Sequence, residues 1–447
     1  MPIRAILLLA FFVLSVPVCF VQPFYGILLW TVVAFLNPQS YVWASEIFPW
    51  ALAVAIPTLI GFPIFSRGWK NLFSGKVLMI VVLWMWFTIT SAISAGTPLF
   101  AHHAADTWFR WQFVSKVLLM TIVAIGIVDS FNRLRILVLV IAGCFAAFVV
   151  KALPFLILTH GAAKIYGPQH SMIADNNDFG LALNMTLPLF FFLAQTEPKR
   201  WVRRLFGFLF LLTIPTIFFT YSRGAMVGVA AIFCLMLLRL KRTLLLVPVM
   251  AIGAVIAVSF APQAWKDRMD PTRAVDASAR ERFNAWTFSW NLAKDYPLTG
   301  GGFATFTPEL FARYAPVTTD IRGPHSIYFG IVAEHGFPGL VLYLTLVGSC
   351  FLTAHRLVKQ ARFHGDQVVA HYANMFRFSL VGFLVCGAFL GRAYFDYYFT
   401  IVACLTVLER VARQEWAQKA QTDEEAVEES GSDELLLPHS GAAFGGI

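Results

Sequence analysis

The chain has 447 residues, of which 58% are hydrophobic and only 13% are charged, and its formal net charge at pH 7 is +9. Soluble domains carry about 25% charged residues, so this composition, with a mean hydropathy of +0.69, excludes a soluble domain and indicates a polytopic membrane protein. The continuous apolar runs also exclude a transmembrane barrel, which shows alternating segments of about 10 residues.

Apolar runs recur along the whole chain at lengths close to the roughly 20 residues that a membrane-spanning helix needs. They predict an all-α fold with about 12 or 13 transmembrane helices. The runs lie near residues 5–20, 24–36, 49–65, 77–95, 114–128, 136–158, 179–195, 205–220, 224–238, 243–261, 327–354, 378–391 and 395–411. The break at Gln22-Pro23 leaves the topology of the first two runs open, and the second run favours an uncleaved first helix over a signal peptide. The six cysteines lie in apolar runs without metal-ligand spacing and are interpreted as small core residues.

Basic residues gather in alternate links between these runs. The positive-inside rule places such links in the cytoplasm, which explains the net charge without nucleic acid. The basic residues are Arg67, Lys70 and Lys76; Arg133 and Arg135; Lys199, Arg200, Arg203 and Arg204; Arg239, Lys241 and Arg242; and Arg356, Lys359, Arg362 and Arg377. The extracytoplasmic links are then 37–48, 96–113, 159–178, 221–223, 262–326 and 392–394.

This sidedness divides the chain into four parts. We expect N-terminal transmembrane helices over 1–261, a long periplasmic loop over 262–326 and C-terminal transmembrane helices over 327–411. Residues 412–447 form an acidic tail that is expected to be disordered and cytoplasmic. Two outer links contain aromatic clusters, Ser40–Trp43 and Trp108–Trp111, which are typical of an interfacial aromatic belt.

The outer link 159–178 is rich in Gly, Pro and Asn and is predicted to be a loop. Its last residues, Asp175-Asn176-Asn177-Asp178, have the composition of a helix N-cap. A cap needs only one of them, and the surplus amide and carboxyl groups suit sugar hydroxyls. Asp175, Asn176 and Asn177 are therefore open between a cap and a substrate contact.

Two cationic side chains lie in or beside predicted membrane helices, where a charge is costly unless it has a partner. Arg223 sits in a tight outer turn, Tyr221-Ser222-Arg223-Gly224, and its guanidinium matches phosphate oxygens. A snorkelling arginine near a helix end is an equally good explanation. Lys151 lies inside an apolar run and is a further candidate contact to a lipid diphosphate.

Residues 278–293 of the long loop carry an apolar stripe at helical spacing and predict an amphipathic helix. The stripe consists of Phe283, Trp286, Trp290 and Ala293. Arg280 and Arg282 lie at the start of this helix. The glycines at 300–302 follow it, and their N–H groups could approach an anion, although a plain connector explains them better.

His325 and Ser326 lie where the long loop meets the next apolar run. With an unperturbed pKa near 6.5, imidazole suits proton transfer near neutral pH. At a membrane boundary it can meet a polar substrate from one side and a lipid-borne substrate from the other. A boundary histidine before a Pro/Gly-interrupted helix is the simpler explanation. His335 is a second candidate, deeper in the following helix.

Several stretches, in order, resemble the O-antigen ligase and O-antigen polymerase superfamily over about residues 160–345. They are Ser222-Arg223-Gly224, Arg282 four residues before Trp286, Pro297 followed by Gly300–Gly302, and His325-Ser326 with Gly336 and Gly339. Within that superfamily, other segments are most similar to the branch of exosortase-associated O-glycosylation ligases. These are Leu36-Asn37-Pro38, Tyr166-Gly167-Pro168, Asp175-Asn176-Asn177 and Gly300–Phe303.

The resemblance implies an all-helical fold of the lipid-linked glycosyltransferase (GT-C) kind in the bacterial inner membrane. It also implies a metal-independent, inverting transfer of a glycan from undecaprenyl diphosphate on the periplasmic face, with no cofactor. The acceptor is expected to be a hydroxyl of the lipid A-core of lipopolysaccharide. A protein O-oligosaccharyltransferase and a polysaccharide polymerase are alternatives within the superfamily, and a transporter or flippase for an anionic lipid is an alternative of another class.

The chemistry of such a transfer assigns roles to the outer residues. The departing diphosphate needs cationic donors, and the outer segments contain no Asp-x-Asp motif for a divalent ion. We therefore assign diphosphate binding to Arg223, Arg282 and Arg280, and general-base catalysis to His325. The candidate substrate contacts are Lys151, Tyr166, Asp175, Asn176, Asn177, Ser326 and His335.

Overall fold

The computed structural model describes residues 3–41, 48–66, 68–239, 259, 261–270 and 277–435. All regular structure in these ranges is helical, as predicted, and no strand occurs among them. Most of the predicted apolar run 243–261 lies outside the described residues, as do the basic residues Arg67, Lys241 and Arg242 and the end of the acidic tail, 436–447.

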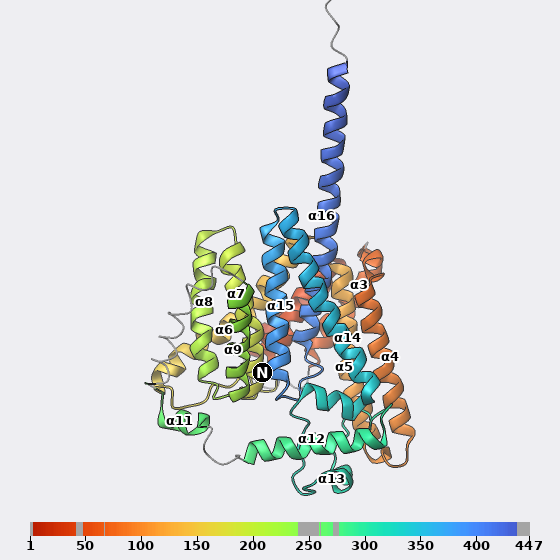
Figure 1. Cartoon of the computed structure of the whole chain (residues 1–447), viewed down its shortest axis with the longest axis vertical. Coiled ribbons are helices and arrows are strands. Elements are labelled where there is room, and N and C mark those ends of the chain that lie inside the picture. The colour runs from red at the N-terminus through yellow and green to blue at the C-terminus, as the bar shows by residue number, and fades with distance from the viewer. Residues whose placement is uncertain are drawn as a thin grey trace, which may run out of the picture.

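Most helices run along a bundle, and three short or oblique helices cover one of its ends (Figure 1). The bundle helices are α1 Ile3–Val21, α2 Pro23–Phe35, α3 Trp50–Phe65, α4 Gly75–Gly96, α5 Ala104–Ile127, α6 Phe131–Leu158, α7 Asn176–Thr196, α8 Arg200–Phe218, α9 Arg223–Arg239, α14 Ile327–Phe363, α15 Gln367–Gly387 and α16 Asp396–Leu435. The covering helices are α11 Gln263–Met269, α12 Ala277–Asp295 and α13 Pro308–Tyr314, and 3-10 turns lie at Pro38–Tyr41, Gly68–Leu72 and Ala101–His103.

Eight helices in the described part of the chain are long and apolar enough to span a membrane, and α2, α3 and α9 are shorter apolar helices. The prediction of a polytopic membrane protein is thus confirmed, while the number of about 12 spans stays a prediction. Two of the predicted links were wrong in their bounds: Trp108–Trp111 lie inside α5, and Arg377 lies inside α15, rather than in links. Pro23 starts α2, where the missing N–H costs nothing, so the break at Gln22 separates two helices.

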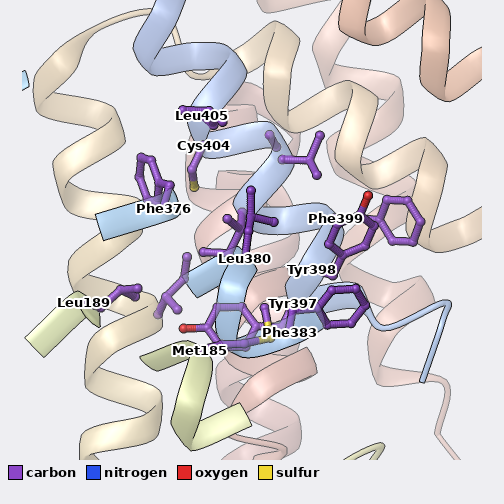
Figure 2. Packing of buried hydrophobic residues seen from close by; sticks show 14 of the residues in the cluster. Met185, Leu189, Phe376, Leu380, Phe383, Tyr397, Tyr398, Phe399, Cys404 and Leu405 are labelled. Carbon is purple, nitrogen blue, oxygen red and sulfur yellow. The ribbon is translucent and has the colours of Figure 1, made fainter. Parts of the chain in front are cut away.

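The centre of the bundle is formed by α7, α15 and α16. Figure 2 shows Met185 and Leu189 of α7 facing aromatic residues of the other two helices. Phe383 of α15 stacks on Tyr398 of α16 with ring centroids 4.5 Å apart. Because lipid is as apolar as these side chains, such close packing rather than the hydrophobic effect holds membrane helices together.

Glycines allow α7, α9 and α15 to approach each other closely, as small residues do between membrane helices. A Cβ atom at these glycines would collide with the neighbouring helix. It would lie 2.7 Å from Ala225 at Gly180, 2.3 Å from Cys386 at Gly228 and 3.1 Å from Asn184 at Gly382. These contacts bring the first turn of α9 against the first turns of α7.

The two sets of links lie at opposite ends of the bundle. The links α7–α8 and α14–α15 are at the upper end in Figure 1, and α11, α12 and α13 are at the lower end. We call these the basic end and the loop end. Two ion pairs join elements at the basic end, Arg135–Glu197 and Lys76–Glu409, each at 2.5 Å. Which end faces the periplasm stays a prediction from the positive-inside rule.

The tail prediction was wrong for residues 412–435, because α16 continues to Leu435 and projects beyond the basic end (Figure 1). Ala, Glu, Gln, Lys and Arg dominate the segment from Arg413 to Glu429, and all have high helix propensity. The segment also extends an existing helix and so pays no nucleation cost. Charge and low hydrophobicity, which suggested disorder, describe an exposed helix equally well.

The predicted amphipathic helix is present as α12, which lies across the loop end (Figure 1). Its buried face, however, differs in part from the predicted stripe, of which only Ala293 is fully buried. Phe288 and Leu292 are fully buried, and Phe288 stacks on Phe311 of α13 at 4.3 Å. Phe283 and Trp290 are 57% and 48% exposed. The neighbouring α13 decides which of two adjacent apolar faces is covered.

A break in α14 anchors the loop end. Gly336 has φ 68° and ψ −175°, which interrupts the helix. A Cβ atom there would lie 2.3 Å from the backbone oxygen of Leu298. The N–H groups of Gly301 and Gly302 donate to the carbonyls of Ala333 and Glu334 at 2.8 and 2.9 Å. These hydrogen bonds fix the glycine loop to α14, so its two N–H donors are not available to an anion.

Candidate functional site

A pocket of about 370 Å³ opens at the loop end, where four segments that are distant in sequence meet. The segments are the start of α7, the start of α12, the residues before α14 and the residues before α16. The pocket is lined by Asp175, Asn177, Asp178, Ser278, Arg282, Gly323, Pro324, His325, Leu390, Gly391 and Arg392. Four of the predicted site residues, His325, Arg282, Asp175 and Asn177, thus share one cavity of the size that ligand sites have.

His325 holds a strained backbone conformation at this pocket. Its φ is +44°, in the left-handed region that residues other than glycine rarely adopt. Gly391 packs against it, since a Cβ atom there would lie 3.0 Å from Pro324 and 3.5 Å from the His325 nitrogen. The imidazole is half-buried and makes no hydrogen bond to another described residue. Strain of this kind concentrates at functional sites.

Burial lowers the pKa of His325 below its usual 6.5, and the positive charge of Arg282 lowers it further. Arg322 acts in the same direction, whereas Glu281 and Asp178 raise the pKa. The ring is therefore predominantly neutral at pH 7. A neutral imidazole has a nitrogen lone pair that can accept a proton.

Of the two arginines on α12, only Arg282 lines the pocket, and Arg280 is exposed. Residues two apart on a helix point to different sides, so both cannot reach one cavity. Trp286 fixes the start of α12 against α14 by stacking on Phe329 with centroids 5.3 Å apart.

An ion pair that was not predicted from the sequence, between a buried carboxylate and a partly exposed arginine, forms one wall of the pocket. Arg392 donates from Nη2 to Oδ2 of Asp178, which is 6% exposed. The pair joins the start of α7 to the segment before α16. Arg392, like Arg223, is a single arginine in a short outer link, and this is the sequence signal that could have predicted it.

The four polar residues at the start of α7 divide into caps and pocket residues. Asp175 accepts a hydrogen bond from the backbone N–H of Asn177 at 2.8 Å and is the N-cap, while both residues also line the pocket. Asn176 is buried and donates from Nδ2 to the Thr220 carbonyl at 2.7 Å. Asn176 therefore ties α7 to the turn that carries Arg223, rather than facing a substrate.

Arg223 begins α9 beside the pocket but is not one of its lining residues. Gly224 contacts Phe389, which directly precedes the pocket residues Leu390 and Gly391. Tyr221, two residues before Arg223, has φ +59°, so the turn is also strained. Arg223 is thus partly exposed at the edge of the same assembly of loops.

A second pocket of about 400 Å³ lies against the start of α7 and contains Lys151 and Tyr166. Lys164 and Tyr41 also line it, and the Lys151 ammonium lies 4.8 Å from the centroid of the Tyr41 ring. Phe179, one turn after Asp175, contributes to this wall. The structure therefore places Lys151 and Tyr166 together, but in a cavity separate from that of His325.

His335 and Ser326 are not pocket residues. His335 is fully buried, stacks on Phe87 at 4.2 Å and shares a 2.7 Å hydrogen bond with Thr90. Ser326 is 1% exposed at the start of α14. The neighbouring Glu334 is also buried and accepts hydrogen bonds from Tyr394 and from the backbone N–H of Ala304. These residues hold the core beneath the site.

Within the described residues, His, Cys, Asp and Glu side chains form no group of three that could hold a metal ion. The polar groups of the His325 pocket are instead two arginines, carboxylates, an amide and an imidazole. Such a set can bind an anion and remove a proton from a hydroxyl group.

Comparison with known families divides the chain into two matched segments. Residues 208–344 match the O-antigen ligase family, and residues 3–196 match a family of unknown function (DUF5935). The ligase segment contains Arg223, Arg282 and His325, so the resemblance to the O-antigen ligase superfamily is confirmed there. The nearer resemblance to the exosortase-associated branch stays a prediction. No curated protein matches the chain.

Proposed function

We propose that this membrane protein, whose residues 208–344 match the O-antigen ligase family, transfers a glycan from undecaprenyl diphosphate to an acceptor hydroxyl at the His325 pocket. The observation that carries the proposal is that His325 and Arg282, 43 positions apart in the chain, line one cavity with Asp175 and Asn177. A base, a cation and sugar-binding groups are the parts that such a transfer requires.

In the proposed reaction the acceptor oxygen attacks the anomeric carbon while the bond from that carbon to the diphosphate oxygen breaks. His325 takes the proton of the hydroxyl, which its lowered pKa permits at neutral pH. Arg282 binds the departing diphosphate through its planar fork of donors. Attack from the face opposite the leaving group inverts the configuration.

The other arginines have different roles in this proposal. Arg392 is already paired with Asp178, so it positions the wall of the pocket rather than adding net positive charge. Arg223, at the edge of the loops, is placed to meet a diphosphate that arrives with its lipid from the membrane. Arg280 is exposed and makes at most a weak, solvent-screened contribution.

The functions within the superfamily differ in the acceptor that receives the glycan. We propose lipid A-core of lipopolysaccharide as the acceptor, with a protein hydroxyl or a growing glycan as the alternatives, and a GT-C type fold in the bacterial inner membrane. The transfer is proposed to be metal-independent because arginine carries the charge of the leaving group. The second pocket, with Lys151 and Tyr166, is a candidate site for a further part of the lipid-linked donor.

One reconstitution tests the proposal. Purified protein is given a lipid-linked glycan donor with lipid A-core or with a serine-bearing peptide, each in the presence of EDTA. Transfer to either acceptor in EDTA supports the proposal and identifies the acceptor. Loss of transfer in EDTA with recovery in Mg²⁺ would contradict the arginine mechanism. Lipid flux across vesicles without any glycan transfer would favour a transporter, which should instead have its polar site near the membrane midplane.

The sidedness of the site has its own test. A cysteine placed at Ser278, which lines the pocket, should react with an impermeant thiol reagent in intact cells. Labelling only after lysis would place the pocket on the cytoplasmic side.

A further inference from the structure

A cavity of about 700 Å³ lies at the basic end, opposite the His325 pocket, and no role has been assigned to it. It is formed by the turn before α4, the start of α4, and the parts of α14 and α16 that lie at the basic end. α14 packs against both of the other helices. Five cations and one carboxylate line it: Lys70, Lys76, Arg356, Arg410, Arg413 and Glu409.

The single carboxylate does not neutralise these cations. Glu409 pairs with Lys76 at 2.5 Å and with Arg413 at 2.7 Å. Arg410 donates to the backbone carbonyls of Ile125 and Val128, and its Nε is buried without a hydrogen-bond partner in the described part of the chain.

Lys70 and Arg356 are exposed and make no ion pair with any described residue. The cavity therefore keeps an excess of positive charge and has unused donors on two of its walls. An anion of matching size would satisfy them.

The surroundings of the cavity point to a lipid rather than a soluble anion. Exposed apolar side chains run along one face of α4 from the cavity, at Leu78, Val82, Met85, Ile89 and Ile93. On α14, Val341, Leu344 and Leu352 are exposed in the same way, and Leu352 lines the cavity. Phe73, also in the lining, is 91% exposed. An apolar ring this exposed suits contact with lipid rather than with water.

We propose that this cavity binds the headgroup of an anionic phospholipid from the leaflet at the basic end. Lys70 and Arg356 contact its phosphate oxygens, and its acyl chains lie along the exposed faces of α4 and α14. Basic pockets between membrane helices on the cytoplasmic side bind such headgroups. The proposal is independent of glycan transfer, because the cavity lies at the other end of the bundle from His325.

Native mass spectrometry of the full-length protein in detergent tests the proposal. The protein is titrated with cardiolipin, phosphatidylglycerol and phosphatidylcholine, and a parallel sample receives glycerol 3-phosphate as a competitor without acyl chains. The variant Lys70→Gln/Arg356→Gln is compared with Arg203→Gln/Arg204→Gln, which makes the same charge change on α8 at the same end of the bundle. All four positions are exposed, so both variants should fold, and size-exclusion profiles check this.

We expect cardiolipin and phosphatidylglycerol to bind more tightly than phosphatidylcholine. The cavity variant should lose about fivefold in affinity per cation, or about 25-fold in total, while the α8 variant stays near wild type. Equal loss in both variants, or equal affinity for phosphatidylcholine, would overturn the site. Displacement of the lipid by glycerol 3-phosphate would show a site for free phosphates and overturn the assignment to a lipid.

Discussion

His325→Ala removes the single imidazole among the described residues that line the loop-end pocket, and keeps Arg282 and the ion pair between Asp178 and Arg392. We expect the rate of glycan transfer to fall about 10²–10⁴-fold, the usual contribution of a positioned general base. This corresponds to about 3–5 kcal/mol of the activation barrier. Donor binding should be retained, because the diphosphate contacts are assigned to the arginines.

The magnitude rests on the environment of His325. The ring makes no hydrogen bond to another described residue, so none has to be broken before it accepts a proton. An unperturbed histidine is already about three-quarters neutral at pH 7, and burial with the charge of Arg282 increases this fraction. More than about three-quarters of the molecules would therefore hold the base in its active, neutral state at pH 7.

The assay measures donor-lipid binding and glycan transfer on the same monodisperse samples. His160→Ala is the matched control, because His160 is exposed in an outer link and lines no pocket described above. His335→Ala should behave differently and lower the thermal stability, since His335 is buried against Phe87. Near-wild-type transfer by folded His325→Ala would refute the assignment of the base, and the transporter class would have to be reconsidered.

Three further predictions concern the pocket and its support. Arg282→Lys keeps the charge but loses the planar fork of donors. We expect kcat/KM to fall about tenfold or more, but by less than the 10²–10³-fold loss that removal of a whole donor causes. Full activity would show that only the charge matters at this position. The rate of transfer should fall as the pH drops through the lowered pKa of His325, because the ring becomes protonated. Glu281→Gln should shift this low-pH decline of the rate to lower pH, because Glu281 raises the pKa of His325. A decline at the same pH in both proteins would contradict the assignment of this titration to His325. Gly336→Ala should lower the free energy of unfolding by about 2 kcal/mol or more and so lower Tm, because alanine disfavours the positive φ at this position. Gly348→Ala on the same helix, where a Cβ atom meets open space, should leave Tm unchanged. Equal Tm values for the two variants would show that the break in α14 is not strained.

The sequence alone predicted an all-helical, polytopic membrane protein, which the structure confirms. Membrane helices are predicted well because every backbone polar group must be satisfied within its own segment, which makes each span a continuous apolar run. The alternation of basic links likewise separated the two ends of the bundle correctly. Local amphipathicity also predicted α12, at nearly its observed bounds.

The pocket could be predicted only in part. His325 and Arg282 were found because each lies in a short motif that is visible locally. The pair of Asp178 with Arg392 joins residues 214 positions apart, and no local pattern links them. Arg280 was predicted to bind diphosphate together with Arg282, but the helix directs the two side chains to different sides. Which of the two sides faces the pocket is set by the tertiary structure.

What the sequence by itself determined is the all-helical membrane architecture, the order of most bundle helices, and the end of the bundle at which the polar motifs gather, because these depend on hydropathy, charge and short motifs. Only the tertiary structure decided that His325 lines a pocket while His335 is buried, that α12 buries Phe288 rather than Phe283, and that the glycine loop bonds to α14. The physical reason is that burial depends on the neighbour that covers a side chain. In each of these cases that neighbour comes from a distant part of the chain.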